Sequence, residues 1–202
     1  MPVVGIGTVD GMAPFTPPAA DAVRARLLLA ARDEFAASGL VGGKVERIAA
    51  AASSNKAQVF HYFGSKEGLF DALVEQTVAE TFERVPLDTD DLPGFAGRLH
   101  DAWAERPWAQ RLTTWHRLDR ASAVPLDAVL ERQTAMVAEV ERAQRAGVLP
   151  RSYRPAVLLG LVLHLAAFWS EAGPESEALT RAVVPARRRQ VVVDAVTSLV
   201  GG

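Results

Sequence analysis

Residues 45–70 read VERIAAAASSNKAQVFHYFGSKEGLF. Apolar residues recur at helical spacing on both sides of the polar pair Ser53-Ser54, which predicts two short helices joined by a turn. Asn55 is a preferred N-cap residue and opens the second helix, which we expect to run to about Tyr62. Two helices joined in this way are typical of a helix-turn-helix, whose second helix enters the major groove of DNA.

The second of these helices has an apolar side, which includes Val59 and Phe63, and a polar side. A recognition helix reaches base edges mainly from its N-terminal turn, so we expect sequence readout from the polar side. The candidates for base contacts are Lys56, Ala57, Gln58 and His61. Gln58 can form a bidentate pair with adenine, and Lys56 can donate to guanine. The predicted DNA-binding set also contains Asn55 and the residues expected to meet the phosphodiester chain, which are Lys44, Phe60, Tyr62 and Lys66.

Helical spacing continues beyond this stretch. A first helix is predicted over 21–38, with Gly39 as its natural stop. Gly43 is the expected N-cap of the helix that begins near Val45, and Ser65 is the expected N-cap of a longer helix toward Val85. After a loop at 86–93, helical period returns over 95–105, 108–118, 126–146, 156–171 and 186–200. No alternating strand pattern of convincing length occurs, so the predicted fold class is all-α.

Composition limits the class of protein. The chain has 202 residues, 49% hydrophobic and 23% charged, which is ordinary for a globular protein that can bury a core. It has no cysteine, which excludes disulfides and thiolate metal sites and agrees with a cytoplasmic location. The longest apolar stretch, 156–169, is interrupted by His164 and falls short of the ~20 residues that span a bilayer, so we expect no membrane segment. Residues 1–20 lack the features of a signal peptide and are expected to form a flexible tail.

The charge is distributed unevenly. Residues 21–70 carry seven cations and five acids, a balance of +2, whereas the whole chain carries -2 and the remainder therefore -4. Such an asymmetry suits a small DNA-contacting end on a larger, solvated body.

The run from Arg24 to Phe70 resembles the N-terminal domain of TetR-type transcriptional regulators. The matching positions are Ala31, Phe35, Gly39, Val45, Ile48, Ala49, Ala52, Val59, Phe60, His61, Tyr62, Phe63, Ser65, Lys66, Glu67 and Leu69. The chain departs from the family pattern in four places. Gly43-Lys44 replaces the usual Thr at the second helix, Ser53-Ser54 replaces Gly-Val in the turn, Ala57 replaces a Gly, and Phe60 replaces the common Tyr, which removes a hydroxyl able to bond a phosphate.

The resemblance implies a helix-turn-helix domain at 21–66 and a larger helical bundle at 67–202 that senses a ligand and dimerises. Within the bundle, aromatic residues with a few polar groups are the mixture expected around a small, largely apolar molecule. The candidate ligand-binding residues are Trp103, Trp115, His116, Gln133, Met136, His164 and Phe168. Each of them could equally be an ordinary core or interface residue.

The resemblance also implies a homodimer formed by the last two helices. We expect the segment 156–169, apolar nearly all round, to contribute to that surface, together with Val191, Val192, Val193, Val196 and Leu199. Two-fold symmetry would match a palindromic double-stranded operator with half-sites about 34 to 36 Å apart.

The sequence therefore predicts a sequence-specific transcriptional regulator, a repressor released from DNA by a small molecule. We expect no enzyme activity, cofactor or metal, because the four histidines are far apart in sequence and no nucleotide-binding or hydrolase motif is present. Two alternatives stay open at this point. They are a helical-bundle enzyme and a protein-interaction module without sequence-specific DNA binding.

Overall fold

The computed structural model describes residues 19–120 and 125–201. Over this part of the chain every regular element is a helix, which confirms the all-α prediction. The N-terminal elements are α1 (Ala19–Gly42), α2 (Val45–Ala51), α3 (Lys56–Phe63) and α4 (Lys66–Arg84). The others are α5 (Leu92–Glu105), α6 (Pro107–Asp119), α7 (Asp127–Arg145), α8 (Pro155–Glu171), α9 (Pro174–Leu179) and α10 (Pro185–Val200). Residues 1–18 of the predicted tail lie outside the described residues, whereas Ala19 and Ala20 already belong to α1.

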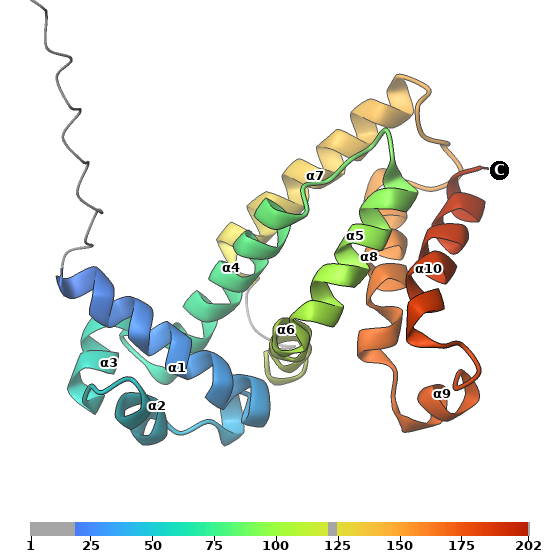
Figure 1. Cartoon of the computed structure of the whole chain (residues 1–202). Helices are drawn as coiled ribbons and strands as arrows, with labels where there is room; N and C mark the ends of the chain where they lie inside the picture. The colour runs from blue at the N-terminus through green and yellow to red at the C-terminus, as the bar shows by residue number, and fades with distance from the viewer. Residues whose placement is uncertain (1–18, 121–124, 202) are drawn as a thin grey trace, which may run out of the picture.

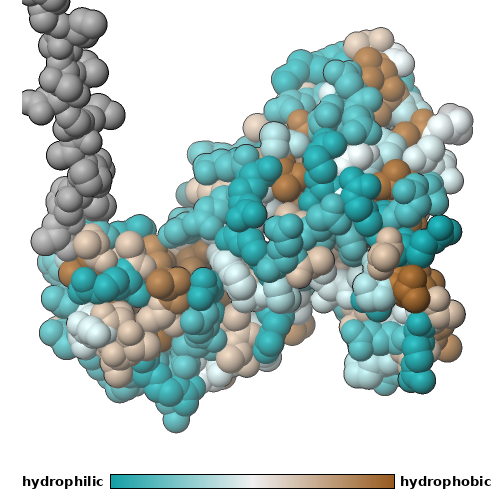
Figure 2. Space-filling model, viewed as in Figure 1, coloured by the Kyte–Doolittle hydropathy of each residue, from teal (hydrophilic) through white to brown (hydrophobic). Residues whose placement is uncertain are grey.

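The helices form two groups joined by α4 (Figure 1). Helices α1, α2 and α3 lie together at one end, and α4 runs from them toward the other end alongside α7. There α5, α8 and α10 pack against one another. Helix α6 lies between the groups, and its most extensive contact is with α1. Figure 2 shows a mainly hydrophilic surface along α4 and α7.

Each group has its own hydrophobic core. The first contains Phe35 and Phe70, whose rings meet edge to face at 5.1 Å between centroids, and includes Leu112 from α6. The second gathers buried side chains of α5, α7, α8 and α10. The first half of α4 packs in the first core, so the helix is fixed at the end from which it leaves the helix-turn-helix. The domain boundary after residue 66 stays a prediction.

Local differences from the predicted elements have physical causes. Lys44, not Gly43, is the N-cap of α2, so the expected capping role of Gly43 is wrong. A Cβ on Gly43 would lie 2.6 Å from the Phe35 ring, so this glycine allows the backbone to pass close to the core. The backbone N–H of Lys44 donates to the Glu34 carboxylate at 2.8 Å instead of to a capping side chain. Helix α9, with six residues, was not predicted because so short a segment has too little period to detect.

The predicted stop at Gly39 is confirmed, although α1 resumes briefly after it. Gly39 has φ 67° and ψ -175°, a conformation that residues with a Cβ rarely adopt. Beyond the kink, the Leu40 N–H donates to the Asp119 carboxylate at 2.7 Å. Arg120, the next residue, donates to Asp71 of α4 at 2.7 Å. The end of α6 is therefore attached to both α1 and α4.

His116, one turn before this attachment, is half-buried and stacks on Phe70 with 6.2 Å between ring centroids. Burial lowers the pKa of His116, against an opposing effect of nearby Asp71 and with a further lowering by Arg120. The unfolded chain then binds a proton more readily than the folded chain. Stability is therefore fully present above the unfolded histidine pKa of about 6.5 and decreases as the pH falls below it.

We expect His116→Phe, which keeps an aromatic ring beside Phe70, to remove this part of the pH dependence. Urea unfolding of both proteins between about pH 7.5 and pH 5.5 measures it, because the wild type should lose more stability than the variant over the range in which histidine titrates. Equal slopes in the two proteins would show that His116 does not contribute.

Candidate nucleic-acid interface and ligand cavity

The recognition helix α3 is capped at both ends, and its buried face packs against the first core. The Asn55 side chain accepts the Gln58 backbone N–H at 3.0 Å, which confirms the predicted N-cap. Gly64, with φ 75°, ends the helix, and the Ser65 hydroxyl accepts the Gly68 N–H at 2.9 Å to start α4. Val59 is fully buried in the first core. These contacts fix the orientation of α3 and leave its opposite face toward solvent.

The predicted DNA-binding residues divide by exposure. Those with exposed side chains are Lys44, Asn55, Lys56, Ala57, Phe60 and His61. Those that are half-buried are Gln58, Tyr62 and Lys66. The Ser54 hydroxyl donates to the Gln58 side-chain oxygen, which restricts the rotamer of Gln58. Tyr62 packs against the first core and meets His61 edge to face at 5.1 Å. Six residues of the set belong to α3, and Gln58 among them is held by the turn that precedes the helix.

Lys56 is paired with an acid that the sequence did not mark as part of this surface. Its ammonium lies 2.6 Å from the Glu46 carboxylate, with side chains 54% and 66% exposed. The hydrogen bond from Lys56 lowers the pKa of Glu46, so this carboxylate is charged at neutral pH. Ion pairs this exposed contribute little to stability, and Lys56 can leave Glu46 for a stronger acceptor.

Lys66 has a role inside the protein. Its ammonium donates to the backbone carbonyl of Gly43 at 3.2 Å and to that of Val41 at 3.4 Å. These carbonyls belong to the end of α1 and the loop to α2, where helical partners are missing. Lys66 therefore joins the start of α4 to the end of α1, and its phosphate contact stays a prediction.

Helices α1 and α2 are joined by a charge pair. Arg47 binds the Glu34 carboxylate through its Nε atom, at 2.9 Å from Oε2 and 3.0 Å from Oε1. The hydrogen bond from Arg47 lowers the pKa of Glu34. Because Arg47 is neutralised in this way, fewer of the cations counted over residues 21–70 are available to DNA than the sequence balance suggests.

A cavity of about 170 Å³ lies in the helical bundle, between α4, α5, α6, α7 and α8. Of the seven predicted ligand residues, the structure brings together Trp103, Gln133 and His164. The cavity is completed by Thr77, Val78, Thr81, Phe82, Ala109, Gln110, Thr113, Leu163, Ala167 and Glu171. Most of these residues are threonines and aliphatic residues, which carry no distinctive signal on a helix, and only the tertiary structure shows that Phe82, Gln110 and Glu171 meet at this cavity.

The other four predicted ligand residues lie elsewhere. Trp115 packs against the first core, and His116 stacks on Phe70. Met136 is buried in the second core and is not part of the cavity lining. Phe168 is 45% exposed on the outer side of α8. None of the four lines the cavity.

Comparison with known proteins gives the same two-part division. Residues 27–73 match the family profile described as bacterial regulatory proteins, tetR family. Residues 91–197, more than half of the chain, match the profile described as tetracyclin repressor-like, C-terminal domain. The chain belongs to the tetR family.

Individual relatives agree with this assignment. The HTH-type transcriptional repressor SCO4008 of Streptomyces coelicolor is 34% identical over 148 residues, which cover 72% of this chain and 77% of that protein. The crystal structure of SCO4942 from Streptomyces coelicolor has a TM-score of 0.77 and 36% identity, covering 88% of this chain and 98% of that one. Salmonella enterica GusR shares the fold, with a TM-score of 0.66, 19% identity, and coverage of 89% and 96%. The tetR-family protein described here is therefore a DNA-binding transcriptional regulator, as the sequence predicts.

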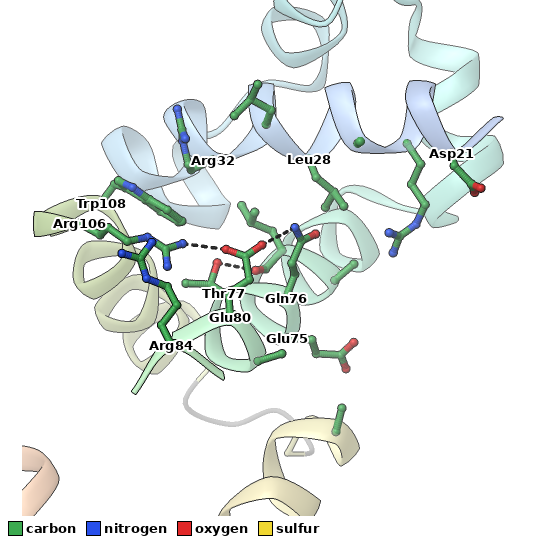
Figure 3. A pocket seen from close by; sticks show the side chains of 17 residues that line it. Asp21, Leu28, Arg32, Glu75, Gln76, Thr77, Glu80, Arg84, Arg106 and Trp108 are labelled. Carbon is green, nitrogen blue, oxygen red and sulfur yellow. Dashed lines mark hydrogen bonds and ion pairs between the residues drawn. The ribbon is translucent and has the colours of Figure 1, made fainter. Parts of the chain in front are cut away.

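This tetR-family chain also has a large open groove, of about 1170 Å³, between α1, α4 and α6 (Figure 3). Arg32 of α1 and Arg106 both point toward Trp108, with guanidinium carbons 5.1 and 4.7 Å from the ring centroid. Arg106 also donates to Glu80 of α4 at 2.8 Å, and Glu80 accepts from Gln76 at 2.7 Å. The groove is thus crossed by a polar network that links all three helices.

Within 19–120 and 125–201, no group of three or more His, Asp or Glu side chains is placed to hold a metal ion. Over the same residues, no helix is both long enough and apolar enough to cross a bilayer.

Proposed function

We propose that this tetR-family protein is a homodimeric repressor that binds a palindromic operator through α3 and releases it when a small molecule enters the cavity in the helical bundle. The observation that carries the DNA-binding half is the geometry of α3. Asn55 and Val59 fix the helix, while Lys56, Ala57 and His61 remain exposed on its other face. Repression of an operator places the protein in the cytoplasm, where bacterial DNA is, and the absence of cysteine agrees with that location.

Dimerisation through α8 and α10 is supported by unpartnered apolar side chains. Val157, Leu161 and Phe168 of α8 and Val191 of α10 are exposed in the single chain. Val192 and Val196, which the sequence analysis assigned to this surface, are buried in the protomer's own core, so their assignment is wrong. The three successive valines 191–193 cannot all belong to one surface, because neighbouring residues of a helix point to different sides. A two-fold interface would pair the exposed face with itself.

Coupling between the cavity and DNA is proposed to run through α4 and α6. Thr77 and Thr81 of α4 and Gln110 and Thr113 of α6 line the cavity. The far end of α6 holds the backbone at Leu40 through Asp119 and holds α4 through Arg120. A ligand that displaces either helix would change the separation of the two recognition helices. The required difference in binding free energy between the two states is about 1 to 3 kcal/mol, typical of allosteric coupling.

Selection of binding sites from random duplexes tests the proposed function. We expect the purified protein to enrich one palindrome with half-sites about one turn of duplex apart, and to bind it as a dimer. Recovery of no common sequence, under conditions in which a known DNA-binding control succeeds, would contradict the proposal and favour a protein-interaction module.

Glu46 provides a second test of the DNA surface. We expect Glu46→Gln to tighten operator binding by about two- to fivefold at low salt, because it removes an acid beside the phosphates and releases Lys56. Fluorescence anisotropy with a labelled duplex measures the change. Glu83→Gln, an exposed acid near the other end of α4, is the matched control and should leave affinity unchanged. Equal effects of the two substitutions would indicate a general charge effect and place Glu46 away from DNA.

A further inference from the structure

The cavity in the helical bundle has the size of a small ring. Its volume of about 170 Å³ is close to that of an apolar cavity known to take benzene, about 150 Å³. Phe82, Trp103 and Leu163 provide apolar walls. The shape therefore fits a compact molecule with an apolar body, and the polar groups around it decide which head group that molecule carries.

Three threonines line the cavity, and the hydroxyl of each has already used its only proton. Thr77 donates to the Leu73 carbonyl at 2.7 Å, Thr81 to the Thr77 carbonyl at 2.7 Å, and Thr113 to the Gln110 carbonyl at 2.9 Å. A hydroxyl has one donor and two acceptor lone pairs. Each of these oxygens can therefore only accept a hydrogen bond from a ligand.

His164 is an exposed residue that also lines the cavity. Its Nδ1 lies 2.8 Å from the Gly160 carbonyl oxygen. A carbonyl cannot donate, so Nδ1 carries the hydrogen in this contact, and in the neutral imidazole Nε2 is then left as an acceptor.

Two further polar residues of the lining, Gln110 and Glu171, are hydrogen-bonded to each other. Gln110, only 5% exposed, donates through Nε2 to Glu171 Oε1 at 2.8 Å. The Glu171 carboxylate can only accept, and it is the one formally charged group in the lining. Arg117 approaches the same Oε1 atom at 3.9 Å, but its side chain is 59% exposed and it does not line the cavity.

Acceptors thus outnumber donors around the cavity. The N–H groups that remain among its lining side chains belong to Trp103, Gln133 and the second hydrogen of Gln110. An anionic head group would have only these few N–H groups as hydrogen-bond partners. It would also lie close to the Glu171 carboxylate and to the acceptor atoms of Thr77, Thr81, Thr113 and His164, which cannot replace its lost hydration. A protonated amine complements the cavity, because it has hydrogen-bond donors and no acceptor.

We infer that the ligand of this cavity is a small organic cation, a protonated amine on a compact apolar body. Its ammonium donates to Glu171 and to the neighbouring threonine and His164 acceptors, and its body contacts Phe82 and Trp103. An aromatic face close to a cation adds attraction of the cation–π type. This inference rests on the proposed function for the existence of a ligand, and it assigns the ligand's chemical class.

Three probes of equal size and different charge test the inference. Benzylammonium, benzyl alcohol and benzoate are titrated into the full-length protein and followed by calorimetry. We expect benzylammonium to bind at least about tenfold more tightly than benzyl alcohol, and benzoate not to bind. Glu171→Gln, which keeps an acceptor oxygen for Gln110, should weaken benzylammonium by at least about tenfold and leave benzyl alcohol within about twofold. Glu175→Gln, on the exposed surface of α9, is the matched control and should change neither.

Several results would overturn the inference. One is benzoate binding as tightly as benzylammonium, and another is an unchanged benzylammonium affinity in a folded Glu171→Gln protein. The third is no benzylammonium binding up to about 10 mM, a concentration at which even a site with a Kd of about 1 mM would be nearly filled. Operator binding, measured on the same preparations, separates this inference from the proposed function. Retained operator binding with failed cation binding would reject the ligand class alone, whereas absence of operator binding would reject the proposed function whatever the probes do.

Discussion

Gly39→Ala is expected to lower the free energy of unfolding by about 2 to 6 kcal/mol. The backbone at Gly39 has φ 67° and ψ -175°, a region open almost only to glycine, where another residue costs about 1 to 3 kcal/mol. An added Cβ would also lie 2.7 Å from Asp119 Oδ2 and 2.8 Å from Trp115 Cε3, so overpacking adds about 1 to 3 kcal/mol. Urea unfolding followed by circular dichroism measures the loss.

Gly147→Ala is the control for this prediction. Gly147 also has a positive φ, 77°, but a Cβ there would have no atom within 4 Å. Gly147→Ala therefore introduces the backbone strain without a steric clash, and we expect it to lower the free energy of unfolding by about 1 to 2 kcal/mol. If the two substitutions cost the same, the close packing of α6 against the kink in α1 would not contribute to stability.

Gln58→Ala is expected to remove about 1 to 3 kcal/mol of discrimination at one base position of each operator half-site. Gln58 is the residue of α3 best suited to a bidentate contact, and the Ser54 hydroxyl holds its side chain. The variant should bind a wider set of sequences, with base preference lost at that position only. Site selection with the wild type and the variant measures the change.

Lys44→Ala is the matched comparison for Gln58→Ala. Lys44 is exposed beside α3, and as a phosphate contact its loss should weaken all duplexes alike and reduce the slope of log affinity against log salt by about 1. An unchanged selected sequence for the Gln58 variant would show that another residue reads the bases.

The sequence predicted the parts of the fold that depend on short-range chemistry. Asn55, Ser65 and Gly39 have local preferences strong enough to place a helix start or stop, and each is confirmed. The helical period likewise located the long helices, with boundaries shifted by a few residues, as for α5, which begins at Leu92 rather than 95. In contrast, Gly43 packs against the Phe35 ring, eight residues earlier in the sequence, and is not the N-cap of α2. Lys44 takes that position, and its backbone N–H donates to Glu34.

The site was less predictable, because it depends on which helix faces meet. Trp115 and Trp103 are both aromatic residues of the helical bundle, yet only Trp103 reaches the cavity. The pairings of Lys56 with Glu46 and of Gln110 with Glu171 join residues of different helices. No pattern within one helix reveals such partners, so the hydrogen-bond donors and acceptors that remain free at a site can be identified only from the tertiary structure.

The contribution of Leu112 to the first core limits how this protein can be divided. Leu112 belongs to α6, more than thirty residues beyond the helix-turn-helix, and it is fully buried among side chains of α1 and α4. A fragment cut after α4 would expose this part of its interior to water. A chimaera that joins the N-terminal helices of one homologue to the remaining helices of another at such a cut would therefore have a poorly matched contact between α6 and the first core. New operator specificities are better introduced by substituting exposed residues of α3 alone.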